Sequence, residues 1–376
     1  MEDIRMVDLK RQYHRYKSEI DSAIGKVIDS SSFIKGDEVS LFESELSAYL
    51  DIKHVIACAN GTDALQLALM ALNLKPGDEV ITSDFTFIAT AEVIALLGLK
   101  PVLVDPDPGT FNISPENIRK SVSKKTRVIL PVHLFGQCAD MEEIMDIAGK
   151  HNIHLIEDTA QALGADCIFS NGIKRKAGTI GTIGTTSFFP SKNLGCYGDG
   201  GALFTNDDDL AAMIRSIGNH GMTKRYYHDH IGINSRLDTI QAAILRVKLK
   251  YLDTFNRERK MVADTYDREL GSIKELTIPE RSSFSSHIFH QYTLKCDPLR
   301  RDGLIEYLAA KSIPSMVYYP VPLHRQKAYA YLNLKDDGFE STNMLSDCVI
   351  SLPVHTEMDD EQLSFICSSI KEYFEK

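Results

Sequence analysis

Short runs rich in Val, Ile and Leu alternate with helical stretches of about ten residues between about positions 55 and 205 of the sequence. In chain order, the predicted strands are 55–58, 79–82, 100–104, 127–132 and 154–157, and the predicted helices are 62–72, 86–97 and 141–151. Strands that are apolar throughout are buried on both faces, and a helix between two strands is typical of a parallel βαβ unit. This pattern predicts an α/β domain built on a mostly parallel sheet.

The pattern changes after a long predicted helix that covers residues 235–269. Asn234 or Ser235 is expected to cap this helix, and Leu237, Ile240 and Ile244 share one of its faces. A shorter strand at 291–295, a helix at 304–312 and several prolines follow. A chain of 376 residues has room for two domains of about 150 residues each. We expect a large domain over residues 1–252 and a smaller α+β domain over 253–376.

Charge and cysteine content argue against several classes of protein. Lys and Arg total 42 against 52 Asp and Glu, and this net charge of −10 disfavours a protein that binds nucleic acid through its phosphates. The longest nearly uncharged run, 85–99, contains Glu92 and is shorter than the roughly 20 apolar residues of a membrane span. The first residues lack the apolar stretch of a signal peptide, and the seven cysteines form no CxxC pair. We expect a cytoplasmic protein with no nucleic-acid or membrane partner.

The first candidate motif, CANGTD at residues 58–63, stands between a predicted strand and a predicted helix. Gly61 lets a ligand approach the backbone closely, and the amides of Thr62 and Asp63 open the helix. A helix N-terminus presents unpaired N–H groups and a partial positive charge, so it is suited to a phosphate. The alternative is a simple strand-to-helix turn with a capping side chain.

The second candidate motif, HLIEDTAQ at residues 154–161, ends an apolar strand with Glu157 and Asp158. The carboxyl edge of a parallel sheet is where α/β proteins bind ligands. A buried carboxylate there needs a cationic or hydrogen-bonding partner, which a protonated heterocyclic nitrogen would provide. The alternative is a solvated carboxylate in a loop.

The third candidate is Lys192, the one charged residue in the stretch 187–198. A lysine in apolar surroundings has a lowered pKa, which suits Schiff-base chemistry, whereas a lysine whose amine reaches solvent is the alternative. Considered together, a phosphate cradle, a strand-end Asp and an enclosed Lys are what pyridoxal phosphate requires. They would supply an anchor, a partner for the pyridine nitrogen and an amine.

The chain resembles the DegT/DnrJ/EryC1/StrS family of sugar aminotransferases, which are pyridoxal 5'-phosphate enzymes of fold type I. The likeness covers nearly the whole chain and rests on blocks that recur in this order: NGTDALQLAL, PGDEVIT, FTFIATAEVI, GQCADM, IEDTAQALGA, TSFFPSKNLGCYGDGGALFTNDDDLA, GINSRLDTIQAAIL and YYPVPLH. Within the family it is most similar to bacterial 3-aminotransferases of UDP-2-acetamido-2-deoxy-3-oxo-glucuronate. The resemblance implies a large α/β/α domain followed by a smaller α+β domain.

The resemblance also implies a role for each matching residue. Lys192 would form the Schiff base and move the proton during catalysis, and Asp158 would pair with the pyridine nitrogen. The other implied cofactor contacts are Gly61, Thr62 and Ser187 at the phosphate, Gln161 at the ring hydroxyl, Phe87 on the ring face and Asn234 from a second subunit. The implied substrate contacts are Arg236, at a substrate carboxylate, and Tyr318, Tyr319 and His324 near the sugar. The compared subgroup has His in place of Tyr318 and Asn in place of His324.

The implied reaction moves the amino group of L-glutamate to the 3-keto group of a UDP-linked sugar, in a homodimer with shared active sites. Its product would serve the synthesis of bacterial surface polysaccharide such as O-antigen. Amination of a TDP-3-keto-6-deoxyhexose or of a UDP-4-keto sugar is an alternative, and so is a non-catalytic regulator that retained the fold. The related 3-dehydratases resemble this family but carry His at the position of Lys192, which argues against that activity.

Two further patterns carry little weight. His228 and His230 lie in a polar stretch, and no third ligand accompanies the histidines at 151 and 154, so no metal site is expected. The glycines at 178, 181 and 184 lack the GxGxxG spacing of a dinucleotide site.

Overall fold

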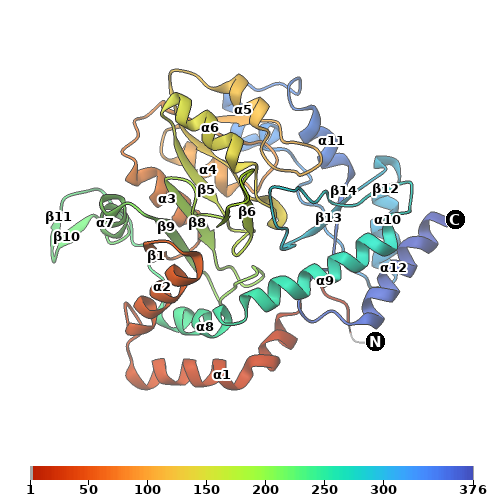
Figure 1. Cartoon of the computed structure of the whole chain (residues 1–376), viewed down its shortest axis with the longest axis horizontal. Coiled ribbons are helices and arrows are strands. Elements are labelled where there is room, and N and C mark those ends of the chain that lie inside the picture. The colour runs from red at the N-terminus through yellow and green to blue at the C-terminus, as the bar shows by residue number, and fades with distance from the viewer. Residues whose placement is uncertain (1–2, 376) are drawn as a thin grey trace.

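The computed structural model describes residues 3–375, and a seven-stranded sheet forms its centre (Figure 1). The strands are β1 (His54–Cys58), β9 (Gly201–Thr205), β8 (Ile183–Ser187), β5 (His154–Asp158), β4 (Thr126–Leu130), β2 (Glu79–Ser83) and β3 (Lys100–Val104), in their order across the sheet. Strand β9 runs antiparallel to both of its neighbours, whereas the remaining pairs are parallel. The predicted mostly parallel sheet is therefore confirmed.

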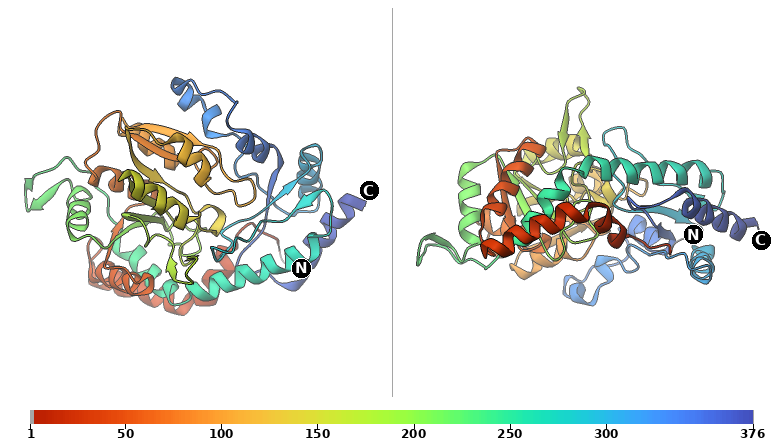
Figure 2. Two further views of the ribbon diagram at one scale, coloured as in Figure 1. Left: turned by 45° about the horizontal axis from the view of Figure 1, so that its top comes forward. Right: turned by 90° about the horizontal axis from the view of Figure 1, so that it is seen from below.

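Helices cover both faces of this sheet and make three layers (Figure 2). One face packs against α3 (Gly61–Ala71), α4 (Ala89–Leu96) and α7 (Asp208–Ile217). The other face packs against α2 (Asp37–Leu50), α5 (Pro115–Ser121), α6 (Met141–His151) and α8 (Thr239–Leu249). Because apolar strands need cover on both sides, this arrangement confirms the α/β/α prediction.

Two strands of the sheet were not predicted from the sequence. Strands β8, with the sequence IGTTS, and β9, with the sequence GALFT, contain few of the Val, Ile and Leu residues that mark buried strands. Both strands lie inside the sheet, so pairing with their neighbours stabilises them and the strand propensity of their own residues contributes little. They flank the loop that carries Lys192.

The predicted helix over residues 235–269 is two helices, and the prediction of one continuous helix is wrong. Helix α8 ends at Leu249, and α9 (Leu252–Leu270) begins after a break at Lys250 and Tyr251. The predicted caps are also wrong, because the cap position of α8 is Asp238. Ser235 instead accepts a hydrogen bond from the amide of Ala59 at 3.0 Å, which keeps this segment extended beside β1.

The C-terminal part is a small α+β unit. Strands β12 (Leu276–Thr277), β13 (Tyr292–Cys296) and β14 (Val349–Leu352) form an antiparallel sheet. It packs against the second half of α9, α10 (Pro298–Ala310) and α12 (Asp360–Glu375). Helix α9 contributes to both cores: Leu252 and Phe255 pack in the large one, whereas Val262 and Tyr266 pack in the small one. The domain boundary near residue 252 stays a prediction.

The remaining elements lie on the periphery. Helix α1 (Leu9–Ser30) lies along α8, α11 (Glu340–Cys348) joins the C-terminal part to the large core, and β6 (Asp166–Ile168) pairs with β7 (Lys174–Lys176). A hairpin of β10 (Met222–Lys224) and β11 (Tyr227–His228) projects from the left side of the molecule in Figure 1. None of the helices within residues 3–375 has the length and apolar character needed to cross a membrane.

The unpredicted strand β9 provides a test of the fold. Leu203 in β9 is fully buried in the core between the sheet and α3, so Leu203→Ala removes packing that the sheet cannot replace. We expect a loss of about 3 kcal/mol in the free energy of unfolding, measured by urea denaturation of the cofactor-free protein. Leu299→Ala is the matched control, because Leu299 is 92% exposed. Equal losses in the two variants would contradict this placement of β9.

Candidate active site

A cavity of about 630 Å³ opens at the carboxyl ends of the parallel strands. Segments that follow β1, β2, β4, β5 and β8 line one side, and segments from the C-terminal part line the other. The structure brings together at this cavity nine of the residues singled out in the sequence: Gly61, Thr62, Phe87, Asp158, Gln161, Ser187, Lys192, Tyr318 and Tyr319. The individual roles implied for these residues stay predictions.

The N-terminus of α3 forms one wall of the cavity. Asn60 caps the helix by accepting a hydrogen bond from the amide of Asp63 at 2.8 Å, which leaves the amides of Gly61 and Thr62 available at the cavity. A Cβ atom on Gly61 would lie only 2.6 Å from the Cβ of Ser187. A glycine is therefore needed here to bring the helix terminus against the end of β8.

Asp158 ends strand β5 and is 5% exposed. Its Oδ1 accepts a hydrogen bond from the amide of Ala160 at 3.0 Å, and its Oδ2 accepts one from the hydroxyl of Thr90 at 3.2 Å. Burial raises the pKa of the Asp158 carboxyl, whereas these donors and the Lys192 ammonium oppose the rise. A cationic partner at this position would hold the carboxylate ionised.

Lys192 lies in the loop 188–200 between β8 and β9. Its amide donates to the carbonyl of Phe189 at 2.8 Å, so the backbone turns tightly just before the lysine. Burial lowers the pKa of Lys192 to about 8, and the negative charge of Asp158 opposes this shift. A substantial fraction of neutral amine is therefore present near pH 8, as Schiff-base chemistry requires.

Gln161 and Tyr319 connect the two sides of the cavity. The Gln161 side chain accepts a hydrogen bond from the amide of Phe135 at 2.8 Å and donates one to the Tyr319 hydroxyl at 3.1 Å. The rings of Phe87 and Tyr319 lie 6.4 Å apart between centroids. Burial raises the pKa of Tyr319, so this phenol stays protonated at neutral pH.

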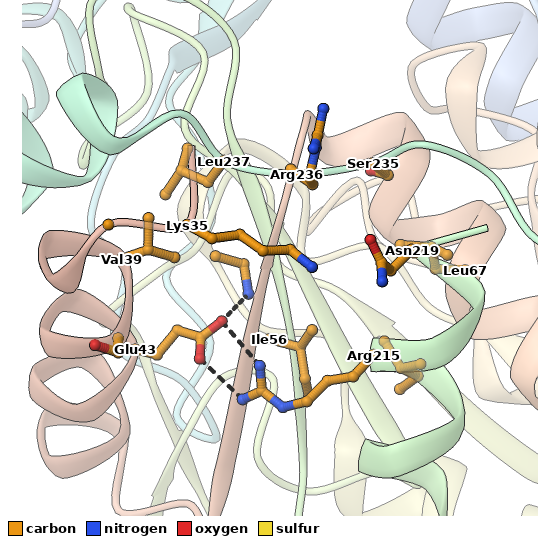
Figure 3. A pocket seen from close by; sticks show the side chains of 15 residues that line it. Lys35, Val39, Glu43, Ile56, Leu67, Arg215, Asn219, Ser235, Arg236 and Leu237 are labelled. Carbon is orange, nitrogen blue, oxygen red and sulfur yellow. Dashed lines mark hydrogen bonds and ion pairs between the residues drawn. The ribbon is translucent and has the colours of Figure 1, made fainter. Parts of the chain in front are cut away.

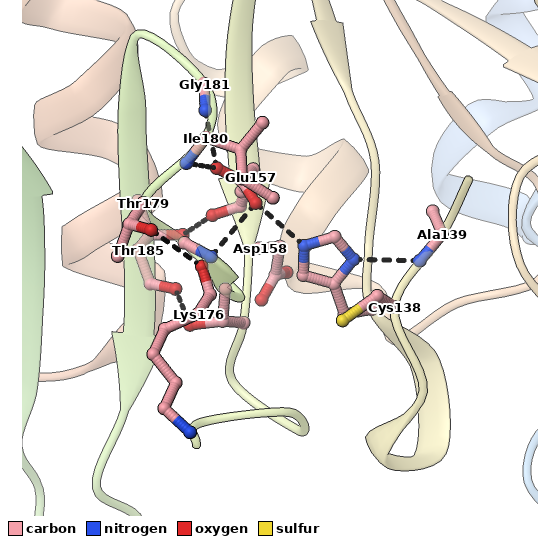
Figure 4. Close-up of polar contacts among 12 residues, drawn as sticks. Cys138, Ala139, Glu157, Asp158, Lys176, Thr179, Ile180, Gly181 and Thr185 are labelled. Atoms are coloured by element: carbon pink, nitrogen blue, oxygen red, sulfur yellow. Dashed lines mark hydrogen bonds and ion pairs between the residues drawn. The ribbon is translucent and has the colours of Figure 1, made fainter. Parts of the chain in front are cut away.

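Glu157 has a different environment from its neighbour Asp158, because successive residues of a strand face opposite sides of the sheet. The Glu157 carboxylate accepts hydrogen bonds from the amides of Ile180 and Gly181, as Figure 4 shows. The amide of Gly178 and the ring of His133 also contact it, at 2.9 and 3.0 Å. Burial alone raises the pKa of Glu157, but these donors outweigh it and the net shift is downward. Glu157 therefore stabilises the base of the sheet as a satisfied carboxylate and does not reach the cavity.

Several residues that line the cavity had not been singled out from the sequence: Asn60, Thr86, Ser191, Asp199, His290 and Gln291. Asn60 and Ser191 lie inside recognised motifs, so their positions could have suggested them. His290 and Gln291 lie just before β13, about a hundred residues beyond Lys192, and no local pattern marks them.

Three predicted residues lie outside this cavity: Asn234, Arg236 and His324. Asn234 pairs with Asn219 in an isolated bridge, and Arg236 lines a separate pocket of about 280 Å³ (Figure 3). In that pocket Arg215 is paired with Glu43, at 2.9 Å, while Arg236 points away from the pair. Neither Asn234 nor Arg236 lines the cavity within one copy of the chain, and their predicted contacts with cofactor and substrate stay predictions.

The structure does not support direct substrate contact by His324. Its Nδ1 lies 2.5 Å from Asp84 and its Nε2 lies 3.0 Å from Asp336, so both ring nitrogens are occupied. The side chain is 1% exposed and is not among the residues that line the cavity with Tyr319. Because Asp84 immediately precedes the segment with Phe87, His324 connects that segment to the one with Tyr318 and Tyr319.

Metal-binding side chains form no cluster in the described part of the chain. Within residues 3–375, no group of three or more His, Cys, Asp or Glu side chains is arranged to hold a metal ion. The seven cysteines are all free and buried.

Comparison with known proteins identifies the chain. The model of the DegT/DnrJ/EryC1/StrS aminotransferase family matches residues 14–371. The chain belongs to this family. UDP-2-acetamido-2-deoxy-3-oxo-D-glucuronate aminotransferase of Pseudomonas aeruginosa is 44% identical over 98% of this chain and 99% of that protein. A protein of Geobacillus stearothermophilus named pleiotropic regulatory protein is 46% identical over 99% of each chain.

Solved structures of aminotransferases have the same fold. DesV of S. venezuelae, in complex with a ketimine intermediate, superposes with a TM-score of 0.95 at 36% identity, over 100% of both chains. A DegT DnrJ EryC1 StrS aminotransferase from Brucella abortus superposes with a TM-score of 0.93 at 39% identity, over 99% of this chain and 100% of that one. The protein is accordingly a pyridoxal-phosphate-dependent aminotransferase of fold type I.

The residues present fit this cofactor. The α3 terminus offers amides to a phosphate, Asp158 offers a buried carboxylate to a ring nitrogen, and Lys192 offers an amine. The hydroxyl of Thr86 and Nδ1 of His290 are buried beside the cavity without a hydrogen-bond partner in the described part of the chain. Unpartnered buried polar atoms at a cavity are expected where a ligand completes the site.

The lowered pKa of Lys192 gives a direct prediction. In the cofactor-free protein, borohydride trapping of pyridoxal phosphate at Lys192 should rise with pH around a midpoint near 8, well below the value of about 10.4 for an ordinary lysine. Asp158→Asn should lower this midpoint further, because it removes the negative charge that favours the ammonium form. Peptide mass spectrometry measures the yield, with exposed Lys26 as an internal comparison. A midpoint near 10 would contradict the burial argument.

Proposed function

We propose that the protein transfers the amino group of L-glutamate to the 3-keto group of a UDP-linked sugar, UDP-2-acetamido-2-deoxy-3-oxo-glucuronate. The observation that carries this proposal is the presence of Lys192 and Asp158 in one cavity with a helix N-terminus. The substrate class is supported by relatives named for 3-amination of UDP-sugars, at 44% and 41% identity. We further propose that the product enters the synthesis of bacterial surface polysaccharide in the cytoplasm.

The chemistry follows from the positions of the chain's own residues. When bound, pyridoxal phosphate supplies an electron sink that stabilises negative charge at the carbon next to the transferred nitrogen. Through its buried carboxylate, Asp158 would keep a proton on the pyridine nitrogen. The Lys192 amine takes the proton from Cα of glutamate, and in the second half-reaction it delivers a proton to C3 of the sugar.

The remaining residues of the cavity hold the reactants. The amides of Gly61 and Thr62 and the Ser187 hydroxyl would bind the cofactor phosphate. Phe87 would cover one face of the cofactor ring, and Gln161 would contact the ring hydroxyl. Tyr318 and Tyr319 belong to the wall nearest the sugar. The mutual contact of Gln161 and Tyr319 aligns the cofactor side of the cavity with the substrate side.

A second copy of the chain would complete the site with Asn234 and Arg236. Exposed apolar residues gather near this segment, since Ile34 pairs with Asp238 in an isolated bridge and is 45% exposed beside Phe33. Tyr226 and Tyr227 in the projecting hairpin are also exposed. Burial of such side chains stabilises association, so we propose a homodimer. The planar guanidinium of Arg236 then suits the carboxylate of a uronate.

Two alternatives rest on specific relatives. A dTDP-3-amino-3,4,6-trideoxy-alpha-D-glucose transaminase of Streptomyces venezuelae is 36% identical, so a dTDP-linked sugar is the second candidate substrate. The Geobacillus relative is named as a regulator, but the retained Lys192 and Asp158 favour catalysis in this chain. A protein that binds no cofactor would support the regulator instead.

Removal of the amine tests the reaction class. Lys192→Ala should lower amino transfer from glutamate to UDP-3-keto-sugar by about 10²–10⁴-fold or more, because the proton-transfer group is lost. The variant should also fail to attach the cofactor covalently after borohydride treatment. Mass detection of the amino sugar measures the first effect and absorbance of the unfolded protein measures the second. Full turnover in Lys192→Ala would overturn the proposed role.

Removal of the guanidinium tests the substrate. Arg236→Ala should lower kcat/KM for the uronate by about 10–100-fold, the size expected for a lost charge-assisted hydrogen bond, with little effect on a neutral 3-keto-6-deoxyhexose. Arg215→Ala is the matched control, since Arg215 lines the same pocket but is paired with Glu43. If the two sugars lost equally, Arg236 would have no role at a carboxylate.

A further inference from the structure

The loop 188–200 that carries Lys192 is held from outside the cavity by helix α8. Lys248, on α8, is 1% exposed, and its ammonium group donates a hydrogen bond to the Gly195 carbonyl at 2.5 Å. No carboxylate pairs with Lys248 among the described residues. Its nitrogen also lies 5.5 Å from the centroid of the Tyr197 ring. A second buried lysine thus contacts the loop three residues beyond Lys192.

The ammonium of Lys248 is costly to bury. Burial lowers its pKa to about 8, and Arg259 adds to this effect. A Met side chain has a similar length and would fill the same space without a polar group to desolvate, so packing alone does not call for a lysine. What lysine adds at this position is a donor for the Gly195 carbonyl.

Gly195 lies directly against the backbone that precedes Lys192. A Cβ on Gly195 would collide with the Pro190 carbonyl oxygen, so the backbone segments before and after Lys192 are in close contact there. The next residue back, Phe189, accepts the hydrogen bond from the amide of Lys192. A shift of Gly195 is therefore transmitted over one contact to the turn that directs the Lys192 side chain.

Gln241 lies about two turns before Lys248 on α8 and contacts the same loop at a second point. Its Oε1 accepts a hydrogen bond from the amide of Tyr197 at 2.8 Å, and its Nε2 donates to the Tyr197 carbonyl at 3.4 Å. Lys248 and Gln241 thus hydrogen-bond to residues 195 and 197 from one helix. Neither side chain lines the cavity.

We propose that Lys248 and Gln241 are positioning residues that hold the loop 188–200 in place and so direct the Lys192 amine to its position beside Asp158. The proposal rests on the role of Lys192 proposed above and extends it to residues that touch neither cofactor nor substrate. Helix α8 begins just after Asn234 and Arg236, so the segment expected to reach a second copy continues directly into the helix that holds the nucleophile.

The test compares three variants of the full-length, cofactor-free protein. Lys248→Met and Gln241→Leu each remove one contact to the loop. Lys295→Met is the control, because Lys295 also donates to a backbone carbonyl, that of Pro108 at 2.8 Å, but from a more exposed position away from the loop. The first measurement is hydrogen exchange of peptides from residues 188–200. The second is the rate of borohydride-trapped attachment of pyridoxal phosphate to Lys192 at pH 8.

We expect exchange in the loop to become about tenfold faster, and trapping about tenfold slower, in Lys248→Met and Gln241→Leu but not in Lys295→Met. Wild-type rates in both loop variants would overturn the proposal, and so would equal losses in all three variants, which indicate general destabilisation. If Lys248→Met does not fold, Gln241→Leu decides by the same criteria. If the wild-type protein is not trapped at Lys192 at all, the proposed function fails, while loop exchange still tests the positioning role.

Discussion

Burial of one amine and one carboxyl in a single cavity is the constraint on which the site depends. Desolvation pushes the pKa of Lys192 down and that of Asp158 up, whereas their mutual attraction pushes both in the opposite directions. The balance leaves an amine that can become neutral near physiological pH beside a carboxylate that keeps its charge when a cation faces it. In a more open cavity the Lys192 amine would stay charged near neutral pH. In a drier cavity the Asp158 carboxylate would lose its charge.

Much of the fold could be predicted from the sequence because its central strands are apolar throughout and are separated by helices. Strands β8 and β9 were missed because Gly and Thr dominate them, and their burial comes from neighbours that no local pattern reveals. The break after α8 was missed for a similar reason. The sequence stays helical across Lys250 and Tyr251, but α8 and α9 follow different surfaces: α8 follows the sheet, and the far half of α9 follows the C-terminal core.

The site divides in the same way. Gly61, Asp158 and Lys192 were predictable because each lies in a short motif whose chemistry can be recognised, and the fold brings all three to one cavity. His290 and Gln291 reach that cavity only through the packing of the C-terminal part, so no pattern near Lys192 could indicate them. Glu157 and His324 show that a polar side chain near a recognisable motif need not line the cavity. Each has a reactive side chain near a motif, but hydrogen bonds engage Glu157 on the far side of the sheet and His324 beside Asp84.

Strand β9, antiparallel among parallel neighbours, has one more consequence. Gly201 at its start is paired with Cys58 on one side and with Ser187 on the other, so it lies between the phosphate motif and the residue that precedes the lysine-bearing loop. A Cβ on Gly201 would collide with the Asn60 carbonyl oxygen, just as one on Gly61 would meet Ser187. The chain after β1 can therefore pass close to the ends of β8 and β9 because Gly61 and Gly201 have no side chains. These two glycines offer no side-chain group to any ligand. A survey of substitutions should nevertheless find them among the least replaceable positions, because any side chain there would push the phosphate motif away from the strands beside it.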